Sequence, residues 1–331
     1  MHDAYTRNAG LPAARGGLEG LLRPGSIEHR SWSESMRRIY TFMAAAVFLV
    51  SGPADAQQNW DEVVVEAHPV VGNIYMLTGS GGNIGVSVGE DGILIVDDQY
   101  APLADKIKSA LRGLHAGPLK FVLNTHFHGD HVGGNPIFGL EATIIAHTNV
   151  RKRVSTPEQR GVQTIPAMVE DGWPVITFDE EVSVHFNGEE IRLVHMPGAH
   201  TDNDSYVYFT GSDVVHMGDT FFNGRFPFVD LRSGGTVDGL IRNIAEVLEI
   251  IGPDTRVIPG HGDLGDRADL RTYHGMLVAT TDAVRAMVAE GKTLDEIKAA
   301  GLPGEWAGYA SDFVPEARWI ETIFNSYGSA E

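Results

Sequence analysis

One short stretch of the sequence concentrates side chains that bind metal ions. Residues 126–131 are His-Phe-His-Gly-Asp-His, so three imidazoles and one carboxylate fall close together. The apolar run 121–123 precedes them and the glycine-containing segment 132–135 follows, which indicates a loop leaving the end of a short buried strand. Imidazole and carboxylate are usual zinc donors, and this spacing lets the first two histidines reach one ion while the aspartate and the last histidine point to a second.

Three later segments also place a histidine or an aspartate beside glycine. They contain His200, Asp219 and His261 within Gly-Ala-His-Thr, Gly-Asp-Thr and Pro-Gly-His-Gly. Glycine lets the backbone turn sharply, so that these polar side chains can face a common site. A further acidic residue, Asp97, follows the apolar run 93–96, which is typical of a strand buried on both faces.

The donor pattern of residues 126–131 resembles the signature of the metallo-β-lactamase superfamily, His-x-His-x-Asp-His after an apolar strand. The three later segments resemble other motifs of that family, and the resemblance covers roughly residues 60–290. It implies an α/β (α+β) fold, a four-layer αββα sandwich with a metal site at one edge. It also implies that residues 57–331 form one hydrolase domain with C-terminal helices.

The resemblance implies a pair of zinc ions joined by a carboxylate. One ion is held by His126, His128 and His200, the other by Asp130, His131 and His261, and Asp219 contacts both. Hydroxide between the ions, which lie about 3.5–4 Å apart in such sites, attacks a substrate carbonyl. Asp130 orients the water and accepts its proton, so Asp130 and Asp219 are the predicted catalytic carboxylates. Asp97 is predicted to lie behind the metal ligands.

Two departures from the family concern the substrate. The β-lactamases closest in the His-Thr loop carry cysteine at the position of Asp219 and lysine at the position of Phe222. Here Asn223 and Arg225 follow Phe222 and are the candidate substrate-binding residues. The Gly-Asp-Thr segment is closer to glyoxalase II, but the basic residues with which that enzyme binds glutathione are not recognised in the C-terminal region.

Composition restricts the partners of this chain. Its hydrophobic content of 43% and charged content of 21% are ordinary for a globular protein of 331 residues. The formal net charge of −19 would repel a nucleic-acid backbone, so no nucleic-acid partner is expected. The chain has no cysteine, which leaves histidine, carboxylates and water as metal donors. A small molecule is the expected partner, and the oligomeric state stays open.

The N-terminal residues predict export. Two arginines precede an apolar run from 39 to 50, and Ala-Asp-Ala follows at 54–56, which is the order of a signal peptide. Residues 36–56 are therefore the predicted signal peptide, and the mature chain would begin at Gln57 in the periplasm or outside the cell. Residues 1–35 are interpreted as translation from an upstream start codon. A retained N-terminal anchor is the alternative, although the apolar run is short for a membrane span.

Apolar patterning predicts the elements that must carry these loops. Strands are predicted at 63–65, 74–77, 84–88, 119–123 and 142–146, with a hairpin of 182–186 and 191–195 around Asn187-Gly188. Helices are predicted over 102–114, 237–251 and 269–290, and Thr236 and Thr293 are predicted caps. Residues 151–174 are predicted to be irregular. The tail is predicted to pack onto the body through Trp306, Phe313, Trp319, Ile320 and Phe324.

The predicted function is an exported dinuclear zinc hydrolase that attacks a carbonyl group in a β-lactam, lactone or ester. The alternatives are a glyoxalase-II-like thioester hydrolase, an iron-binding redox member of the same superfamily, a nuclease and a non-catalytic binding protein. The acidic charge argues against the nuclease, and the complete donor set argues against the non-catalytic protein.

Overall fold

The computed structural model describes residues 58–328 of the chain. The predicted N-terminal extension, 1–35, and the predicted signal peptide, 36–56, lie outside the described residues. Within 58–328, no helix is both long enough and apolar enough to span a bilayer.

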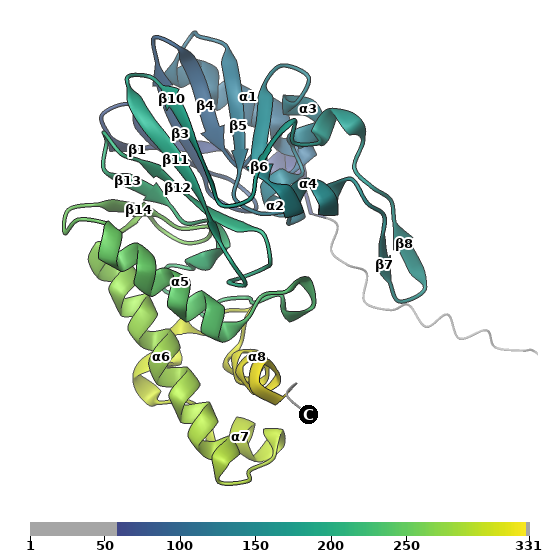
Figure 1. Cartoon of the computed structure of the whole chain (residues 1–331), viewed down its shortest axis with the longest axis vertical. Coiled ribbons are helices and arrows are strands. Elements are labelled where there is room, and N and C mark those ends of the chain that lie inside the picture. Colours follow the sequence, from purple (N-terminus) through teal and green to yellow (C-terminus); the bar gives the residue numbers. More distant parts are fainter. Residues whose placement is uncertain (1–57, 329–331) are drawn as a thin grey trace, which may run out of the picture. The chain divides into compact units, whose positions relative to one another are not determined.

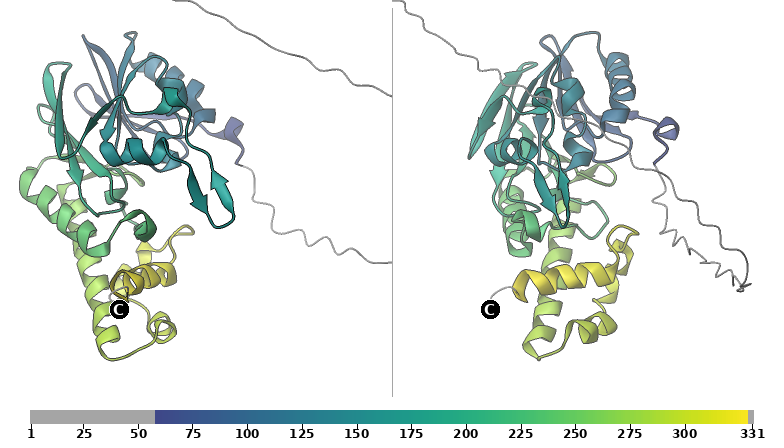
Figure 2. Two further views of the ribbon diagram at one scale, coloured as in Figure 1. Left: turned by 45° about the vertical axis from the view of Figure 1, so that its right-hand side comes forward. Right: turned by 90° about the vertical axis from the view of Figure 1, so that its right-hand side faces the viewer.

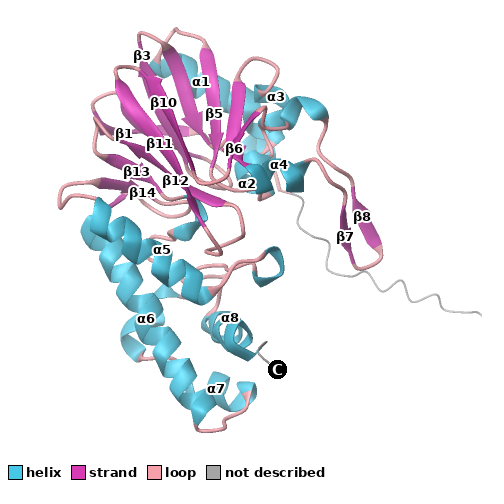
Figure 3. Cartoon of the chain, in the orientation of Figure 1, coloured by secondary structure: helices cyan, strands magenta, loops and turns pink. Residues whose placement is uncertain are grey.

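Two β-sheets form the middle of the fold (Figures 1 and 3). The first has the order β1-β2-β3-β4-β5-β6-β9 and joins β4, β5, β6 and β9 in parallel. Its strands are β1 Glu66–Val71, β2 Ile74–Thr78, β3 Ile84–Gly89, β4 Gly92–Val96, β5 Leu119–Asn124, β6 Thr143–His147 and β9 Ile176–Phe178. Helix α1, Ala104–Leu114, is the crossover between β4 and β5.

The second sheet is antiparallel except for the parallel pair β13 and β14. Its strands are β10 Glu181–Phe186, β11 Glu189–Met196, β12 Asp204–Phe209, β13 Val214–His216, β14 Arg256–Ile258 and β15 Gly265–Asp266. The predicted hairpin is confirmed, because Asn187 and Gly188 join β10 to β11 with φ of 51° and 83°. Positive φ at both turn residues matches the twist of the two strands.

Three apolar clusters separate four layers. In β4, Ile93 and Ile95 pack toward α1, whereas Leu94 and Val96 pack against the second sheet, since successive strand residues point to opposite faces. The other face of the second sheet packs against three helices: α5 Val237–Ile250, α6 Arg267–Ala289 and α8 Glu316–Gly328. The predicted four-layer αββα sandwich is confirmed. Figure 2 shows the two sheets face to face between the helices.

Three helices in the C-terminal half of the chain begin at polar side-chain caps. Thr236 accepts a hydrogen bond from Gly239 N at 2.9 Å and caps α5, Val237–Ile250. Asp266 caps α6, Arg267–Ala289, and Thr293 caps α7, Leu294–Ala300. In both caps the side chain of the capping residue accepts a hydrogen bond from the backbone N–H of the third helical residue, and the side chain of that third residue accepts one from the backbone N–H of the capping residue. The last helix is α8, Glu316–Gly328. The remaining helices are α2 Gly129–Val132, α3 Asn135–Phe138 and α4 Thr148–Val154.

Three predictions of local structure and packing are wrong, either wholly or in part. Residues 63–65 are not a strand, because Lys106 Nζ bonds the carbonyls of Trp60, Asp61 and Val63 at 2.6–2.8 Å and ties this segment to α1. Residues 151–174 are not irregular throughout, since they contain most of α4 and the hairpin of β7, Glu158–Arg160, with β8, Gln163–Ile165. Trp319 and Ile320 are buried in the tail, but Phe313 is 60% exposed.

Candidate metal centre

The loops that carry the predicted ligands meet at one edge of the sandwich. His126 and His128 follow β5, and Asp130 and His131 lie in the short helix α2. The second sheet contributes His200 between β11 and β12, Asp219 after β13 and His261 after β14. The structure brings all seven predicted donors together in two adjoining groups, and within each group the donor atoms lie within 4.8 Å of one another.

The first group combines three imidazoles with one carboxylate oxygen. His128 Nδ1 lies 3.1 Å from His126 Nε2 and 2.9 Å from His200 Nε2. Asp219 Oδ2 lies 3.6 Å from His200 Nε2 and 3.9 Å from His126 Nε2. Since the donor atoms point at a common centre, this group could hold one cation.

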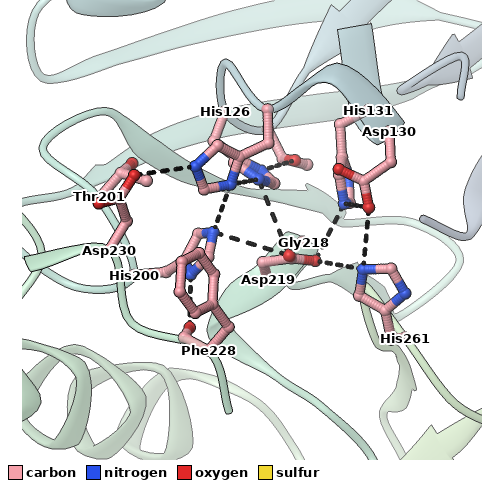
Figure 4. A network of polar contacts seen from close by, with 12 residues as sticks. His126, Asp130, His131, His200, Thr201, Gly218, Asp219, Phe228, Asp230 and His261 are labelled. Atoms are coloured by element: carbon pink, nitrogen blue, oxygen red, sulfur yellow. Dashed lines mark hydrogen bonds and ion pairs between the residues drawn. The ribbon is translucent and has the colours of Figure 1, made fainter. Parts of the chain in front are cut away.

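The second group is built around the other oxygen of the same carboxylate. Asp219 Oδ1 lies 3.0 Å from His131 Nε2 and 3.3 Å from His261 Nε2. Asp130 Oδ2 lies 3.3 Å from His261 Nε2 and 3.7 Å from His131 Nε2. Figure 4 shows Asp219 between the two groups. Asp219 therefore offers one oxygen to each of them.

Two buried atoms of the second group show that a cation fits there. His131 Nε2 and Asp219 Oδ1 have no hydrogen-bond partner of acceptable geometry among the described residues, although both are buried. Unpartnered buried polar atoms are costly, and a metal ion would satisfy both. The donors are nitrogen and oxygen only, which suits zinc and also iron.

Asp97 fixes the orientation of His131. Its Oδ2 lies 2.7 Å from His131 Nδ1, so the ring directs Nε2 into the second group. The same carboxylate accepts hydrogen bonds from Thr125 N at 2.8 Å and Thr125 Oγ1 at 2.7 Å. Asp97 adopts a φ of 64°, which aspartate tolerates better than most residues. A carboxylate behind a ligand histidine sets its tautomer and raises its basicity.

Three other rings are held in the same way by groups that no sequence motif indicated. His128 Nε2 lies 3.2 Å from Asp230 Oδ2, and His200 Nδ1 lies 2.7 Å from the carbonyl oxygen of Phe228. His126 Nδ1 lies 3.1 Å from Thr125 Oγ1. Asp230 stands in an irregular segment far along the chain from His128, so only the folded structure joins them.

Glycines allow the backbone to approach the centre closely. A Cβ on Gly82 would lie 2.2 Å from His131 Cε1, and one on Gly260 would lie 2.2 Å from Asp219 Oδ1. Asn83 links the two sheets here, because its Nδ2 donates to the carbonyls of Pro259 and Gly262 at 3.0 and 2.9 Å. The Gly-Gly-Asn turn between β2 and β3 is thus part of the site. Its paired glycines are the only feature of the sequence that indicates this role.

The candidate substrate-binding residues lie in different surroundings. Asn223 N donates to the His261 carbonyl at 2.9 Å and Asn223 Nδ2 to the Asp263 carbonyl at 2.9 Å, so this residue supports the His261 loop. Arg225 is exposed and lines the cavity in front of the centre. Phe222 stacks on the His261 ring at 5.2 Å between centroids.

Burial and neighbouring charge give the two groups different protonation. Burial lowers the pKa of His200 to about 4 and also lowers the pKa of His126. Burial opposes charge on His261 as well, but nearby carboxylates, Asp219 first, raise the pKa of His261 to about 9. They also raise the pKa of His131. His126 and His200 of the first group are thus neutral imidazoles at neutral pH, whereas the second group requires protons or cations to offset its carboxylates.

A cavity of about 720 Å³ opens in front of both groups. It is large enough for a small organic substrate. Its lining includes Asp130, Asp219, His261, Phe228, Arg225 and Arg232. Phe313, from the segment before α8, also lines this cavity, which explains why it does not enter the core.

The sequence of this chain is similar to a known protein family and to individual known proteins. A sequence model described as the metallo-beta-lactamase superfamily matches residues 67–270. The chain is 26% identical over 178 residues to 2,4-dinitroanisole O-demethylase subunit alpha of Nocardioides sp. (strain JS1661), covering 53% of this chain and 51% of that protein. It is 32% identical over 142 residues to hydroxyacylglutathione hydrolase of Polaromonas sp. (strain JS666), covering 42% and 47%. The chain spans about half the length of these relatives.

Solved structures share the fold at low sequence identity. The sec-alkylsulfatase Pisa1 from Pseudomonas sp. matches with a TM-score of 0.63 and 17% identity over 81% of this chain and 51% of its own. A metallo-beta-lactamase from Pontibacter korlensis matches with a TM-score of 0.54 and 15% identity over 64% and 98%. The match of the family's sequence model extends over more than half of the chain. The chain therefore belongs to the metallo-β-lactamase superfamily.

Proposed function

We propose that this protein is a dinuclear zinc hydrolase that cleaves a carbonyl substrate such as a β-lactam, a lactone or an ester. The observation that carries the proposal is the carboxylate of Asp219, which presents Oδ2 to one set of histidines and Oδ1 to the other. One carboxylate shared between two donor groups is the arrangement that a two-metal hydrolytic site requires.

In this proposal each ion has its own ligands. Zinc in the first group would be held by His126, His128 and His200, and zinc in the second by Asp130, His131 and His261, with Asp219 contacting both. Such ions polarise carbonyl oxygens and lower the pKa of water from 15.7 to about 7.

Asp130 is the proposed proton acceptor. Burial alone would raise the pKa of Asp130, but the neighbouring His131 and His261 lower it, so the side chain is a carboxylate at neutral pH. Its Oδ2 faces the second group and the side chain is 24% exposed, at the lining of the cavity. It can therefore orient a water molecule and accept its proton on the carboxylate oxygen that does not face the second group. Phe222 and Phe228 contribute apolar surface to the lining of the cavity.

A thioester hydrolase is the second candidate. Several relatives are named hydroxyacylglutathione hydrolase, and the Gly218-Asp219-Thr220 segment favours the same class. Arg225 and Arg232 line the cavity and could pair with carboxylates of a peptide-like thiol. Relative rates on thioesters and oxygen esters would distinguish the two candidates.

Export to the periplasm or the medium is part of the proposal. It rests on the arginines, the apolar run and the Ala-Asp-Ala sequence within residues 36–56. The N-terminal sequence of protein recovered from the periplasm should begin at Gln57. A chain that retains residues 36–56 in the membrane fraction would instead indicate an anchor.

The main experiment uses protein that starts at Gln57. We expect two zinc ions per chain by elemental analysis and hydrolysis of at least one of nitrocefin, aryl esters, lactones and thioesters. His126→Ala and Asp130→Ala should lower kcat/KM by about 10²-fold or more while circular dichroism stays unchanged. Iron with oxygen consumption would favour the redox alternative, and wild-type rates in either variant would contradict the ligand assignment.

A further inference from the structure

A second cavity of about 550 Å³ lies beside the first, under the β7–β8 hairpin. The hairpin pairs only with itself and stands out from the two sheets in Figures 1 and 2. Most of the lining is apolar. It includes Phe127, Val132, Val154, Ile165, Pro166 and Met168. We call this space the hairpin cavity.

The hairpin cavity adjoins the cavity in front of the candidate metal centre. His128, Gly129 and Arg153 line both cavities, and so does Glu158 at the start of β7. His128 is itself a donor of the first group. A ligand whose reacting group lies at the centre can therefore extend past His128 into the hairpin cavity.

One charged side chain between the two cavities, that of Arg153, is neutralised by a carboxylate. Arg153 donates from Nε and Nη2 to the two carboxylate oxygens of Asp202, at 2.9 and 2.7 Å, and from Nη2 to the Ser233 carbonyl at 3.0 Å. Its guanidinium also lies 4.8 Å from the centre of the Phe127 ring. Because these contacts occupy its guanidinium, Arg153 lines the boundary between the two cavities and is not available to bind an anion.

The hairpin leaves apolar surface unburied at this cavity. Ile165 lines the cavity and is 40% exposed, and Met168 beside it is half-buried. The remaining polar lining includes Asn149, whose Nδ2 donates to the Asp202 carbonyl at 3.2 Å, together with Thr156, Glu158 and the exposed Lys152. An apolar ligand would remove the exposed surface of Ile165 and Met168 from water.

We propose that the hairpin cavity binds an alkyl or aryl group of the substrate, attached to the scissile carbonyl or to its leaving group. The inference rests on the proposed function and specifies its substrate class: an ester or lactone with a large apolar substituent. The β7–β8 hairpin is then a specificity element, because it supplies part of the apolar lining without contributing a donor to the metal groups.

The kinetic test compares two ester series on the zinc-loaded enzyme, p-nitrophenyl alkanoates from acetate to octanoate and n-alkyl acetates from methyl to octyl. In at least one series, kcat/KM should rise by up to about fourfold for each added methylene until the cavity is filled. Ile165→Asp places a charge in the cavity and should abolish most of this rise. Val162→Asp, at the fully exposed tip of the same hairpin, is the matched control and should retain it.

A binding test does not depend on turnover. Calorimetric titration with octanoate and octan-1-ol should show at least tenfold tighter binding than with acetate and ethanol, and this difference should be lost in Ile165→Asp but kept in Val162→Asp. Ile165→Ser serves if the charged variant folds poorly. Hydrolysis without chain-length dependence, or equal effects of the two hairpin variants, would overturn the inference. Binding that depends on chain length, without hydrolysis, would support ligand binding in the hairpin cavity. It would contradict only the proposed hydrolase function.

Discussion

At the level of single residues, the centre depends on how each imidazole is turned. Asp97, Thr125, Asp230 and the Phe228 carbonyl each contact the ring nitrogen opposite a donor atom. The seven donors were predictable because the family motifs mark them in the sequence. Asp97 was predictable because the resembled family places an aspartate at the end of this buried strand, behind the metal ligands. Asp230 was not, since it has neither a motif nor proximity in sequence to His128.

Asp97→Asn should weaken metal binding by about 10- to 100-fold. Asparagine tolerates the same positive φ and keeps one oxygen for Thr125 N, but it replaces the carboxylate behind His131. Competition with a chromogenic chelator measures the affinity. Asp98→Asn is the control, because Asp98 accepts from Gly134 N at 2.8 Å and contacts no ligand ring. Equal losses in both variants would rule out a specific role for Asp97.

Arg225→Ala should raise KM by about two- to fivefold for substrates that carry a carboxylate, with kcat nearly unchanged. An exposed charge contributes at most about 1 kcal/mol to such a contact. Steady-state kinetics with charged and neutral substrates measures the effect. Arg112→Ala, on the exposed end of α1, is the control. An unchanged KM for charged substrates would remove Arg225 from the substrate-binding residues.

At the level of elements, the turns matter as much as the strands. The strand ends and the caps Thr236 and Thr293 followed from apolar patterning and residue type. Helix α4 and the β7–β8 hairpin did not, because each is too short for a periodic pattern and the hairpin lacks a buried face. Tertiary contacts stabilise α4, whose Val150 and Val154 are buried, whereas the hairpin is held by the pairing of its own two strands.

Gly82→Ala tests the turn between β2 and β3. The new Cβ would overlap the His131 ring, so metal affinity of the second group should fall by about 100-fold or more, with a loss of about 1–3 kcal/mol in stability. Metal titration and thermal unfolding measure both effects. In Gly113→Ala, a Cβ within α1 would meet nothing within 4 Å, and that variant should gain about 0.5–1 kcal/mol. Full metal affinity in Gly82→Ala would contradict the close packing.

The junction of β6 and α4 should make stability depend on pH. His147 stacks on His195 at 3.8 Å between ring centres, and burial, then His195, lowers the pKa of His147 to about 4. Between pH 6.5 and 4 the unfolded chain binds a proton at this position while the folded ring stays neutral. Stability is therefore present above pH 6.5 and is lost as the pH falls toward 4.

His147→Asn should reduce that loss by about 1 kcal/mol after allowance for solvent screening. Asparagine can still cap α4 by accepting from Asn149 N, as His147 does at 3.2 Å. Thermal unfolding at pH 7 and pH 4.5 gives the comparison. His185→Asn, at an exposed histidine of β10, should behave like the wild type. Identical pH responses of His147→Asn and the wild type would reject the effect.

At the level of the whole molecule, both sheets supply residues to the two candidate metal groups. The sandwich was predicted from family resemblance rather than from periodicity, because strands such as β4 are apolar on both faces and do not reveal which side meets which layer. In the folded structure Ile93 and Ile95 face the helix layer, whereas Leu94 and Val96 face the second sheet.

Metal removal should destabilise the protein more at high pH. In metal-free protein the pKa of His261 is raised to about 9, so the stability from its protonated ring is present below pH 6.5 and lost as the pH rises through 9. Bound ions would replace that proton and confer about 4 kcal/mol at a thousandfold excess over Kd. The difference in Tm between zinc-loaded and chelator-treated protein should widen from pH 6.5 to pH 9. A constant or narrowing difference would contradict this assignment.

The split of the donors between the sheets also dictates when a cation can enter. The first sheet supplies two donors to each group, and the second supplies His200 or His261 together with one oxygen of Asp219. Two donors are fewer than the three protein ligands usual for catalytic zinc. A nascent chain must therefore extend beyond position 219 to complete the first group and beyond position 261 to complete the second, and its two sheets must meet, before either group could hold a cation; an ion held at the centre would thus report that the two sheets have assembled.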